Sequence, residues 1–126
     1  MKNNLPEKVS EAWEQRMGSA VFSTTDKYGN PNAIYVNSIR KFNESLFIIA
    51  DNYFDKTRKN IQDGSKGSIL FQAGEVESYQ IKGSLQYHTD GIFYDNMKQW
   101  NKTKHPGHAA VVLEVEDVYE GGVKLM

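Results

Sequence analysis

Residues 46–61 read LFIIADNYFDKTRKNI, and this stretch carries the clearest information about the fold. Its apolar beginning predicts a buried β-strand over residues 45–50, because short apolar runs bounded by turn residues are typical of covered strands. A loop over residues 51–54 follows the strand. Residues 55–63 then predict a short helix, with Asp55 as its N-cap and Gly64 directly after its end.

The start of this predicted helix is basic. Cations are unfavourable near a helix N-terminus, where the helix dipole is positive, whereas phosphate groups bind there well. Lys56 offers a point charge, Thr57 a hydroxyl donor and Arg58 a fork that matches phosphate oxygens. The segment therefore favours a phosphate site, and the alternative is an exposed helix face that happens to be basic.

Alternating and apolar runs predict further strands on both sides of this unit, at residues 19–25, 32–40, 67–73, 78–89 and 109–119. Helical spacing of apolar residues predicts helices over residues 5–17 and 90–100. Strands that follow one another through hairpin turns favour an antiparallel sheet over a parallel α/β fold. We therefore expect a mainly β fold, a six-stranded antiparallel barrel with flanking helices, formed by residues 1–126 as a single domain.

The composition argues against several classes of protein. The 126 residues contain no cysteine, which excludes disulfide scaffolds, thiol catalysis and cysteine-ligated metals. With 15 basic and 16 acidic residues the net charge is −1, which argues against nucleic acid or anionic lipid as the main partner. No apolar run approaches the roughly 20 residues of a membrane span, and residues 1–17 do not form a signal peptide. We therefore expect a cytoplasmic protein without a nucleic acid or membrane partner.

Other candidate site residues are ambiguous on their own. Residues 36–38, Val-Asn-Ser, place small polar side chains in a predicted strand, which fits either an exposed face or contact with a flat polar ring. Gln72 has the same two interpretations, and Trp100 is more typical of helix packing than of a ligand lid. His105 and His108 are three residues apart, but no carboxylate and histidine set completes a site, so no metal is expected. No general acid, base or nucleophile is assigned, and the catalytic residues stay unknown.

Taken in order, these segments resemble the FMN-binding split-barrel family, the group related to pyridoxamine 5′-phosphate oxidase. The resemblance extends from about Gly18 to Tyr119, and the Lys-Thr-x-x-Asn-Ile pattern of residues 56–61 is its most specific part. Five segments carry the resemblance. They are residues 29–31 in the first hairpin turn, residues 46–51 at the predicted buried strand, residues 56–61 in the predicted short helix, residues 80–85 with a Lys-Gly pair, and the predicted strand over residues 109–119. Each is weak alone, and their order along the chain makes the resemblance specific.

The resemblance implies a homodimer that binds flavin mononucleotide (FMN) at the subunit interface. It implies that residues 56 and 57 hold the phosphate, that 36–38 line the isoalloxazine ring, and that 50 and 51 lie near the ribityl chain or ring edge. Gln72 and Trp100 of the partner subunit are weaker members of the site. The implied cofactor-binding residues are Val36, Asn37, Ser38, Ala50, Asp51, Lys56, Thr57, Gln72 and Trp100. A small molecule or an electron donor is the further partner implied.

The implied function is that of a small FMN-dependent oxidoreductase that passes electrons between a reduced carrier and a small acceptor of unknown identity. True pyridoxamine 5′-phosphate oxidase activity is not expected, because the residues after Tyr119 lack the arginine- and tryptophan-rich segment of those enzymes. The open alternatives are a flavin-binding carrier or redox sensor without turnover, a related barrel that binds deazaflavin or haem, and a barrel that binds single-stranded nucleic acid. The near-zero net charge makes the last of these the weakest.

Overall fold

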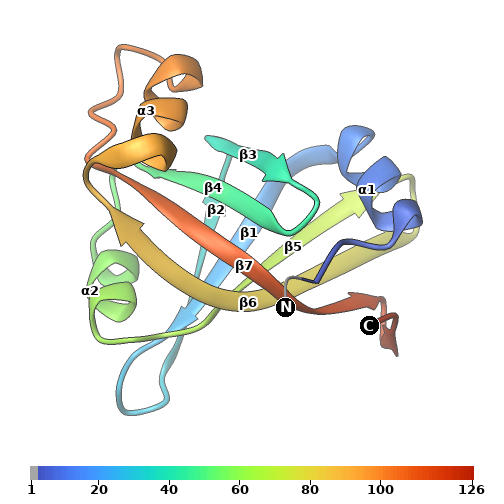
Figure 1. Cartoon of the computed structure of the whole chain (residues 1–126). Helices are drawn as coiled ribbons and strands as arrows, with labels where there is room; N and C mark the ends of the chain where they lie inside the picture. The colour runs from blue at the N-terminus through green and yellow to red at the C-terminus, as the bar shows by residue number, and fades with distance from the viewer. Residues whose placement is uncertain (1–2) are drawn as a thin grey trace.

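The fold is a strongly bent antiparallel sheet with helices at its ends, and the computed structural model describes residues 3–126 of the chain (Figure 1). Within these residues there are three helices, α1 (Glu7–Glu14), α2 (Lys56–Gln62) and α3 (Gly91–Trp100). The strands are β1 (Met17–Thr25), β2 (Pro31–Val36), β3 (Ile39–Asn43), β4 (Leu46–Asp51), β5 (Gly67–Ala73), β6 (Glu77–His88), β7 (Ala109–Glu120) and β8 (Val123–Lys124). None of the helices in residues 3–126 is long and apolar enough to cross a membrane.

The strands pair in the order β2-β1-β5-β6-β7-β4-β3, and β8 adds to β7. Every pair is antiparallel. β2 and β3 are the two edges of this order, yet they follow one another along the chain and are joined by Asn37 and Ser38. The amide of Ala50 in β4 donates a hydrogen bond of 2.9 Å to the carbonyl oxygen of Ser38, which fixes this connection against β4. The expected mainly β antiparallel barrel with flanking helices is therefore confirmed.

The predicted number of six strands is wrong, because the described residues 3–126 contain eight. The predicted strand 32–40 is in fact two strands, since β2 pairs with β1 whereas β3 pairs with β4. The other addition is the two-residue strand β8. The predicted helix over residues 5–17 is also too long, because Met17 pairs with Gln72 at the beginning of β1. Local periodicity does not show such changes of partner, which depend on strands far away in the sequence.

β4 is buried at all six of its positions. Phe47 and Ile49 belong to the main core inside the barrel, whereas Ile48 and Ala50 belong to a second cluster beneath α3. Met97 of α3 is fully buried in that second cluster. Because successive side chains of a strand point to opposite faces, an unbroken apolar run suits a strand that is covered on both faces.

α1 closes one end of the barrel, and α2 and α3 lie towards the other end (Figure 1). Trp13 of α1 is 2% exposed and meets Phe47 and Phe71 edge-on, with ring centroids 5.0 Å apart in both pairs. Edge-on aromatic pairs are worth about 0.5–1.5 kcal/mol beyond the area they bury. The α1 end is therefore filled with side chains, and the larger cavities lie where β2, α2 and the end of β4 meet.

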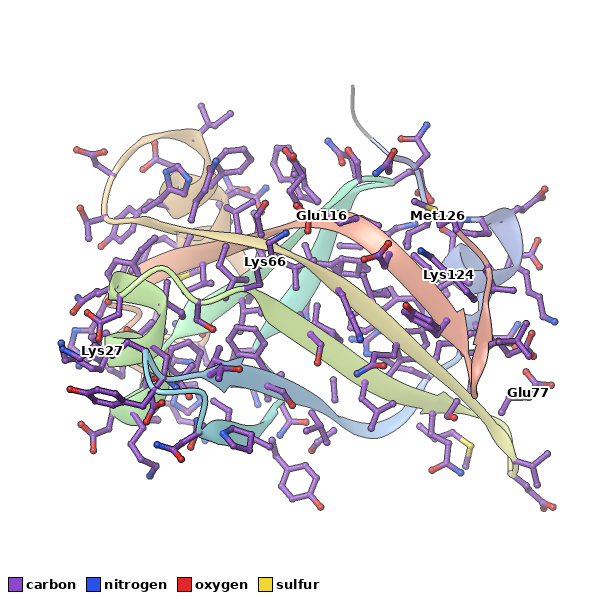
Figure 2. All side chains as sticks on the ribbon, turned by 90° about the horizontal axis from the view of Figure 1, so that it is seen from below. Lys27, Lys66, Glu77, Glu116, Lys124 and Met126 are labelled. Carbon is purple, nitrogen blue, oxygen red and sulfur yellow. The ribbon has the colours of Figure 1, made fainter. Side chains whose placement is uncertain are left out.

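Ion pairs on the surface contribute little to this arrangement. Lys66, which precedes β5, lies beside Glu116 of β7 at 2.7 Å, and both side chains are at least one-third exposed (Figure 2). Lys124 and Met126 lie at the opposite end of the molecule from Lys27 (Figure 2). Exposed ion pairs are typically worth about 0–1 kcal/mol. The fold therefore depends mainly on its core and on the pairing of its strands.

Candidate functional site

A cavity of about 310 Å³, cavity A, lies between the end of β2 and the segment that follows β4. The residues that line it are Ile34, Tyr35, Val36, Asn37, Ser38, Ala50, Asn52, Tyr53, Phe54 and His105. Apolar and aromatic side chains form most of the wall, and a few amide and hydroxyl groups converge on it, as in sites for small organic molecules. This composition suits a flat, largely apolar ring with polar atoms at its edge.

A second cavity, cavity B, is also lined by residues of β2 and has a volume of about 480 Å³. β2 contributes Pro31 and Asn32 to cavity B and residues 34–36 to cavity A. In the same way, Phe54 lines cavity A and Asp55 lines cavity B. The full lining of cavity B is Asp26, Asn30, Pro31, Asn32, Asp55, Lys56, Lys59 and Asn60. The two cavities are therefore lined by neighbouring residues of the same two segments, and cavity A is mainly apolar whereas cavity B carries two lysines and two aspartates.

The two basic side chains of cavity B come from α2, and two aspartates, Asp26 and Asp55, line the same cavity. Lys56 and Lys59 are both exposed on this helix and line the cavity. Thr57 is 2% exposed, and its Oγ1 accepts a hydrogen bond of 3.0 Å from Nδ2 of Asn32, so its own hydroxyl proton remains free to be donated. Asp55 precedes the helix, but its side chain makes no capping hydrogen bond, contrary to the prediction. Because α2 has only seven residues, its capacity to hold an anion rests on these side chains rather than on a helix dipole.

Of the two aspartates in cavity B, Asp26 is already occupied by its own hairpin turn. Its carboxylate accepts hydrogen bonds from Nδ2 of Asn30 at 2.9 Å and from the backbone amides of Asn30 and Tyr28 at 2.8 and 2.9 Å. These bonds, that of the Asn30 side chain first, lower the pKa of Asp26 below its usual range. The carboxylate of Asp26 is therefore engaged in the turn that it stabilises.

Asp51 at the end of β4 forms a buried ion pair beside cavity A. Its fully buried carboxylate accepts hydrogen bonds from Nε and Nη2 of Arg58 at 2.7 and 3.0 Å. It also accepts from the hydroxyl of Tyr87 at 2.6 Å and from the amide of Phe54 at 3.1 Å. The hydrogen bond to Asp51 raises the pKa of Arg58, whereas burial first, and then the bond to Asp51, raise the pKa of Tyr87. The Arg58 fork thus binds Asp51 and joins α2 to β4, and Asp51 does not line cavity A.

Asn52 connects cavity A to the loop between α3 and β7. Its side chain exchanges two hydrogen bonds with the side chain of Asn101, at 2.8 and 3.1 Å, and both residues are 8% exposed. Its Oδ1 also accepts from the amide of Gly107 at 3.0 Å, and its Nδ2 donates to the hydroxyl of Ser38 at 3.2 Å. Asn52 therefore fixes both the loop and the β2–β3 connection around the same cavity.

Four of the nine predicted cofactor-binding residues meet in cavity A, namely Val36, Asn37, Ser38 and Ala50. Lys56 lines cavity B, and Thr57 contacts Asn32 in its wall. The β2–β3 connection, the end of β4 and the start of α2 thus bring the predicted ring and phosphate residues to one side of the barrel.

Gln72 and Trp100 line neither cavity. The Nε2 atom of Gln72 donates hydrogen bonds to the carbonyl oxygens of Gly74 and Glu75, at 3.2 and 3.0 Å. Trp100 packs in the cluster beneath α3, and its Nε1 donates a hydrogen bond of 3.0 Å to Asn96. Their assignment to the site stays a prediction that requires a second subunit.

Several residues that the sequence reasoning did not assign also line cavity A. Asn52, Tyr53 and Phe54 directly follow the predicted strand, and this adjacency was the available signal. His105 had no such signal, because it is 52 residues away from Tyr53, whose hydroxyl lies 3.0 Å from its Nδ1. Within residues 3–126, no group of three or more histidine, aspartate or glutamate side chains is placed to hold a metal ion.

The model of the pyridoxamine 5′-phosphate oxidase family matches residues 5–121. The chain belongs to this family. The resemblance inferred from the order of the sequence motifs is therefore confirmed. An uncharacterized protein of Methanocaldococcus jannaschii is 28% identical to this chain in an alignment of 102 residues that covers 77% of this chain and 68% of that protein.

Solved structures show the same fold for this pyridoxamine 5′-phosphate oxidase family member. A variant of HupZ from Group A Streptococcus is similar with a TM-score of 0.80 and 26% identity, over 91% of this chain and 98% of that one. An FMN-binding protein from Syntrophomonas wolfei subsp. wolfei is similar with a TM-score of 0.74 and 18% identity, over 90% of this chain and 88% of that one. The second similarity concerns the fold, which is a split barrel of the FMN-binding type.

Proposed function

We propose that this family member is a homodimeric flavoprotein that binds one FMN molecule per subunit across cavities A and B. The observation that carries the proposal is that neighbouring residues of β2 and of the segment between β4 and α2 line two cavities, one mainly apolar with amides at its edge and one with two lysines. FMN has the same two parts, a flat ring system at one end and a phosphate group at the other. The similar fold of the FMN-binding protein from Syntrophomonas wolfei supports the proposal.

The residues of cavity A have side chains that suit the ring of FMN. Val36 and Ala50 would supply apolar contacts, and Asn37 and Ser38 would supply hydrogen bonds to its polar atoms. The Oδ1 atom of Asn37 already accepts a hydrogen bond of 2.8 Å from Ser19, so the Nδ2 protons of Asn37 remain for a ligand. When bound, FMN would supply the electron-transfer chemistry, and the protein would bind it, orient it and limit access of water.

Lys56 is the residue on which the proposed choice of cofactor depends. It would contact the phosphate in cavity B, so Lys56→Ala should weaken FMN binding about tenfold and change riboflavin binding less than about twofold. A charge-assisted hydrogen bond is worth about 1.5–3 kcal/mol, and we take the lower end because Lys56 is exposed. Lys124→Ala, at the far end of the molecule, is the matched control (Figure 2).

The measurement is a titration of the purified apoprotein with each flavin, followed by the quenching of flavin fluorescence. Wild-type protein that binds neither flavin, and shows no flavin absorbance as purified, would refute the proposed cofactor. Equal losses for FMN and riboflavin in the Lys56→Ala variant would show that this lysine does not hold the phosphate.

The outward face of β2, β1 and β5 fits the second subunit of the proposed homodimer. Side chains on these strands alternate, and the outward ones carry no charge: Met17, Ser19, Val21, Ser23, Ala33, Tyr35, Ser68, Leu70 and Gln72. Tyr35, Val21 and Leu70 form a cross-strand row, in which Tyr35 is 78% exposed and also lines cavity A. The centres of stable protein interfaces are depleted of charged residues. A second copy on this face would cover cavity A, and Gln72 would lie in the same interface.

Leu70→Glu tests the dimer, because it places a charge in the middle of this face. Leu70 is 42% exposed, so the substitution leaves the core intact. Light scattering after gel filtration should give twice the subunit mass for the wild type and the subunit mass for the variant, with weaker FMN binding. Val123→Glu on β8, where the valine is 66% exposed, should remain dimeric. A monomeric wild type, or a Leu70→Glu variant that stays dimeric, would contradict the proposed interface.

We further propose that the flavoprotein is an oxidoreductase with a small-molecule or protein electron donor. No residue is assigned as acid or base, so the proposal rests on the chemistry of the flavin itself. Anaerobic mixing with NADH or NADPH should bleach the visible absorbance of bound FMN, and added acceptors should restore it. Bound FMN that no donor reduces would instead favour the carrier or sensor without turnover.

A further inference from the structure

A third cavity, cavity C, lies where the neighbouring strands β1, β5, β6 and β7 run side by side. It has a volume of about 280 Å³, shares only Pro31 with cavity B and shares no residue with cavity A. Its wall includes the hydroxyl side chains of Ser23, Thr25 and Ser68, two lysines and two carboxylates. None of its lining residues in the described part of the chain is aromatic. Cavity C therefore suits a small, strongly polar molecule, in contrast to the apolar sites that bind most organic ligands.

A β-bulge in β7 brings the two carboxylates of cavity C to the same side of the sheet. Two consecutive residues of β6 pair with residues 117 and 115 of β7, which leaves Glu116 as the extra residue. Neighbouring residues of a regular strand point to opposite faces, whereas Glu116 and Asp117 both line cavity C. Opposite the bulge β6 has Gly83, where a Cβ atom would overlap the carbonyl oxygen of Glu114. Bulges redirect side chains next to functional sites, and this one gathers negative charge at cavity C.

Lys82 and Asp117 have opposite charges and both line cavity C, yet they do not pair with each other. They lie directly opposite in the β6–β7 pair, where Cβ atoms are about 4.5–5.5 Å apart. The Asp117 carboxylate lies 3.3 Å from Nζ of Lys124, in an exposed ion pair of the weak kind. Nζ of Lys82 lies 5.1 Å from the centre of the Tyr119 ring, and Lys82 takes part in none of the ion pairs found among residues 3–126. Cavity C thus offers an ammonium group and a carboxylate that can each take a further partner.

The other two charges of cavity C already neutralise each other. Oε1 of Glu116 lies 2.7 Å from Nζ of Lys66, and the two side chains lie close together in Figure 2. The hydroxyl of Ser68 accepts a hydrogen bond of 3.4 Å from Nε2 of Gln80, so its own proton remains free to be donated. The groups left for a ligand are therefore one ammonium, one carboxylate and hydroxyl groups.

We propose that cavity C binds the ammonium and carboxylate groups of a free α-amino acid. The ligand carboxylate would contact Nζ of Lys82 and the hydroxyl of Ser68, and the ligand ammonium would contact the carboxylate of Asp117. A ligand with a single charge would leave Lys82 or Asp117 without a partner, whereas an α-amino acid carries both charges on one carbon. Ser23 and Ser68 also belong to the face proposed for the second subunit, so cavity C would lie at the edge of the dimer. The inference does not depend on FMN, because none of the predicted cofactor-binding residues lines cavity C.

The probe is L-alanine, and its two matched controls each lack one charge, since propionate has no ammonium and ethylamine has no carboxylate. Each is titrated into the purified protein, and the amide NMR signals of residues 66–68, 82–83 and 116–117 report binding at cavity C. L-Alanine should shift these signals and bind about tenfold more tightly than either control. Equal binding of L-alanine and either control by the wild type, or the absence of a saturable shift at these residues, would overturn the proposal.

Neutral variants test each charge of cavity C separately. Lys82→Met should make L-alanine bind no more tightly than ethylamine, and Asp117→Asn should make it bind no more tightly than propionate. Both variants should keep the affinity for FMN within about twofold of the wild type. A loss of FMN binding in either variant would assign the residue to the flavin site and would overturn the proposal.

Lys104→Met is the matched control for the charge of Lys82. Lys104 is likewise exposed, takes part in none of the ion pairs found among residues 3–126 and does not line cavity C. This variant should bind L-alanine as the wild type does. An unchanged preference for L-alanine in Lys82→Met, or an equal loss in Lys104→Met, would show that cavity C is not the site.

Discussion

Replacing Asp51 by asparagine is expected to destabilise the protein by about 3 kcal/mol. The carboxylate of Asp51 is fully buried and accepts four hydrogen bonds, two from Arg58, one from Tyr87 and one from the amide of Phe54. An asparagine keeps one acceptor oxygen, removes the negative charge and turns an NH2 group towards donors that already fill the space. The guanidinium of Arg58 would lose its charged partner.

The size of the effect follows from the burial of the two partners. Breaking a buried ion pair by removing one partner costs about 3–5 kcal/mol, because the other charge stays out of water. The side chain of Arg58 is 33% exposed and keeps some contact with water, so we expect the lower end of that range. For a domain of this size, about 3 kcal/mol corresponds to a decrease in Tm of roughly 10 °C. Because Arg58 follows Lys56 by two residues, FMN affinity should also fall more than riboflavin affinity.

The assay is urea unfolding of the wild type and the Asp51→Asn variant, followed by tryptophan fluorescence. Glu116→Gln is the matched control, because it breaks an exposed ion pair with Lys66 and should cost less than about 1 kcal/mol. An Arg58→Gln variant and the double variant complete a cycle. If the cost comes from the unpaired guanidinium, the double variant should lose less stability than the sum of the single variants.

Two results would refute this reasoning. The first is a loss of unfolding free energy in Asp51→Asn no larger than that in Glu116→Gln. It would show that the Arg58 guanidinium becomes hydrated when its partner is lost. The second is an additive cycle, which would show that the two side chains stabilise the protein independently.

Three further predictions concern other positions. Asn52→Ala leaves the buried Asn101 amide and a backbone amide without an acceptor, so it should cost about 2–4 kcal/mol and speed hydrogen exchange in residues 101–108. Gly83→Ala should prevent folding, because a Cβ atom there would overlap a backbone carbonyl of β7, whereas Gly122→Ala, with open space around it, should not change Tm. The pKa of Tyr87 is raised in the folded protein, so its protonated hydroxyl stabilises the fold. This contribution is complete below pH about 10 and is lost as the pH rises through the folded pKa. The stability difference between wild type and Tyr87→Phe, measured by urea unfolding at about pH 8 and about pH 11, should therefore become smaller at the higher pH.

The strand, loop and helix of residues 45–63 could be predicted closely from the sequence. The structure has β4 at residues 46–51 and α2 at 56–62. This part was predictable because a strand covered on both faces and a helix start are properties of neighbouring residues. The grouping of residues 36–38 with Ala50 came from the resemblance to the family, and the structure brings the four residues together in cavity A.

The assignment of Arg58 to a phosphate could not be corrected from the sequence. Arg58 follows Asp51 by seven positions, and nothing in that spacing shows that the carboxylate is buried beneath the guanidinium. The break in the predicted strand 32–40 was hidden for a related reason, since β2 and β3 pair with different strands. A pattern of alternating residues is the same whether a strand keeps its partner or changes it.

By itself, the sequence determined that β4 is buried, that the start of α2 is basic and that the chain belongs to its family. These features depend on the identity and order of residues close together in the chain. Only the tertiary structure decided that Arg58 binds Asp51, that Asn52 is paired with Asn101 and that His105 faces Tyr53. The last two pairs are 49 and 52 residues apart, and such residues meet only after the strands have paired and the barrel has bent around its core.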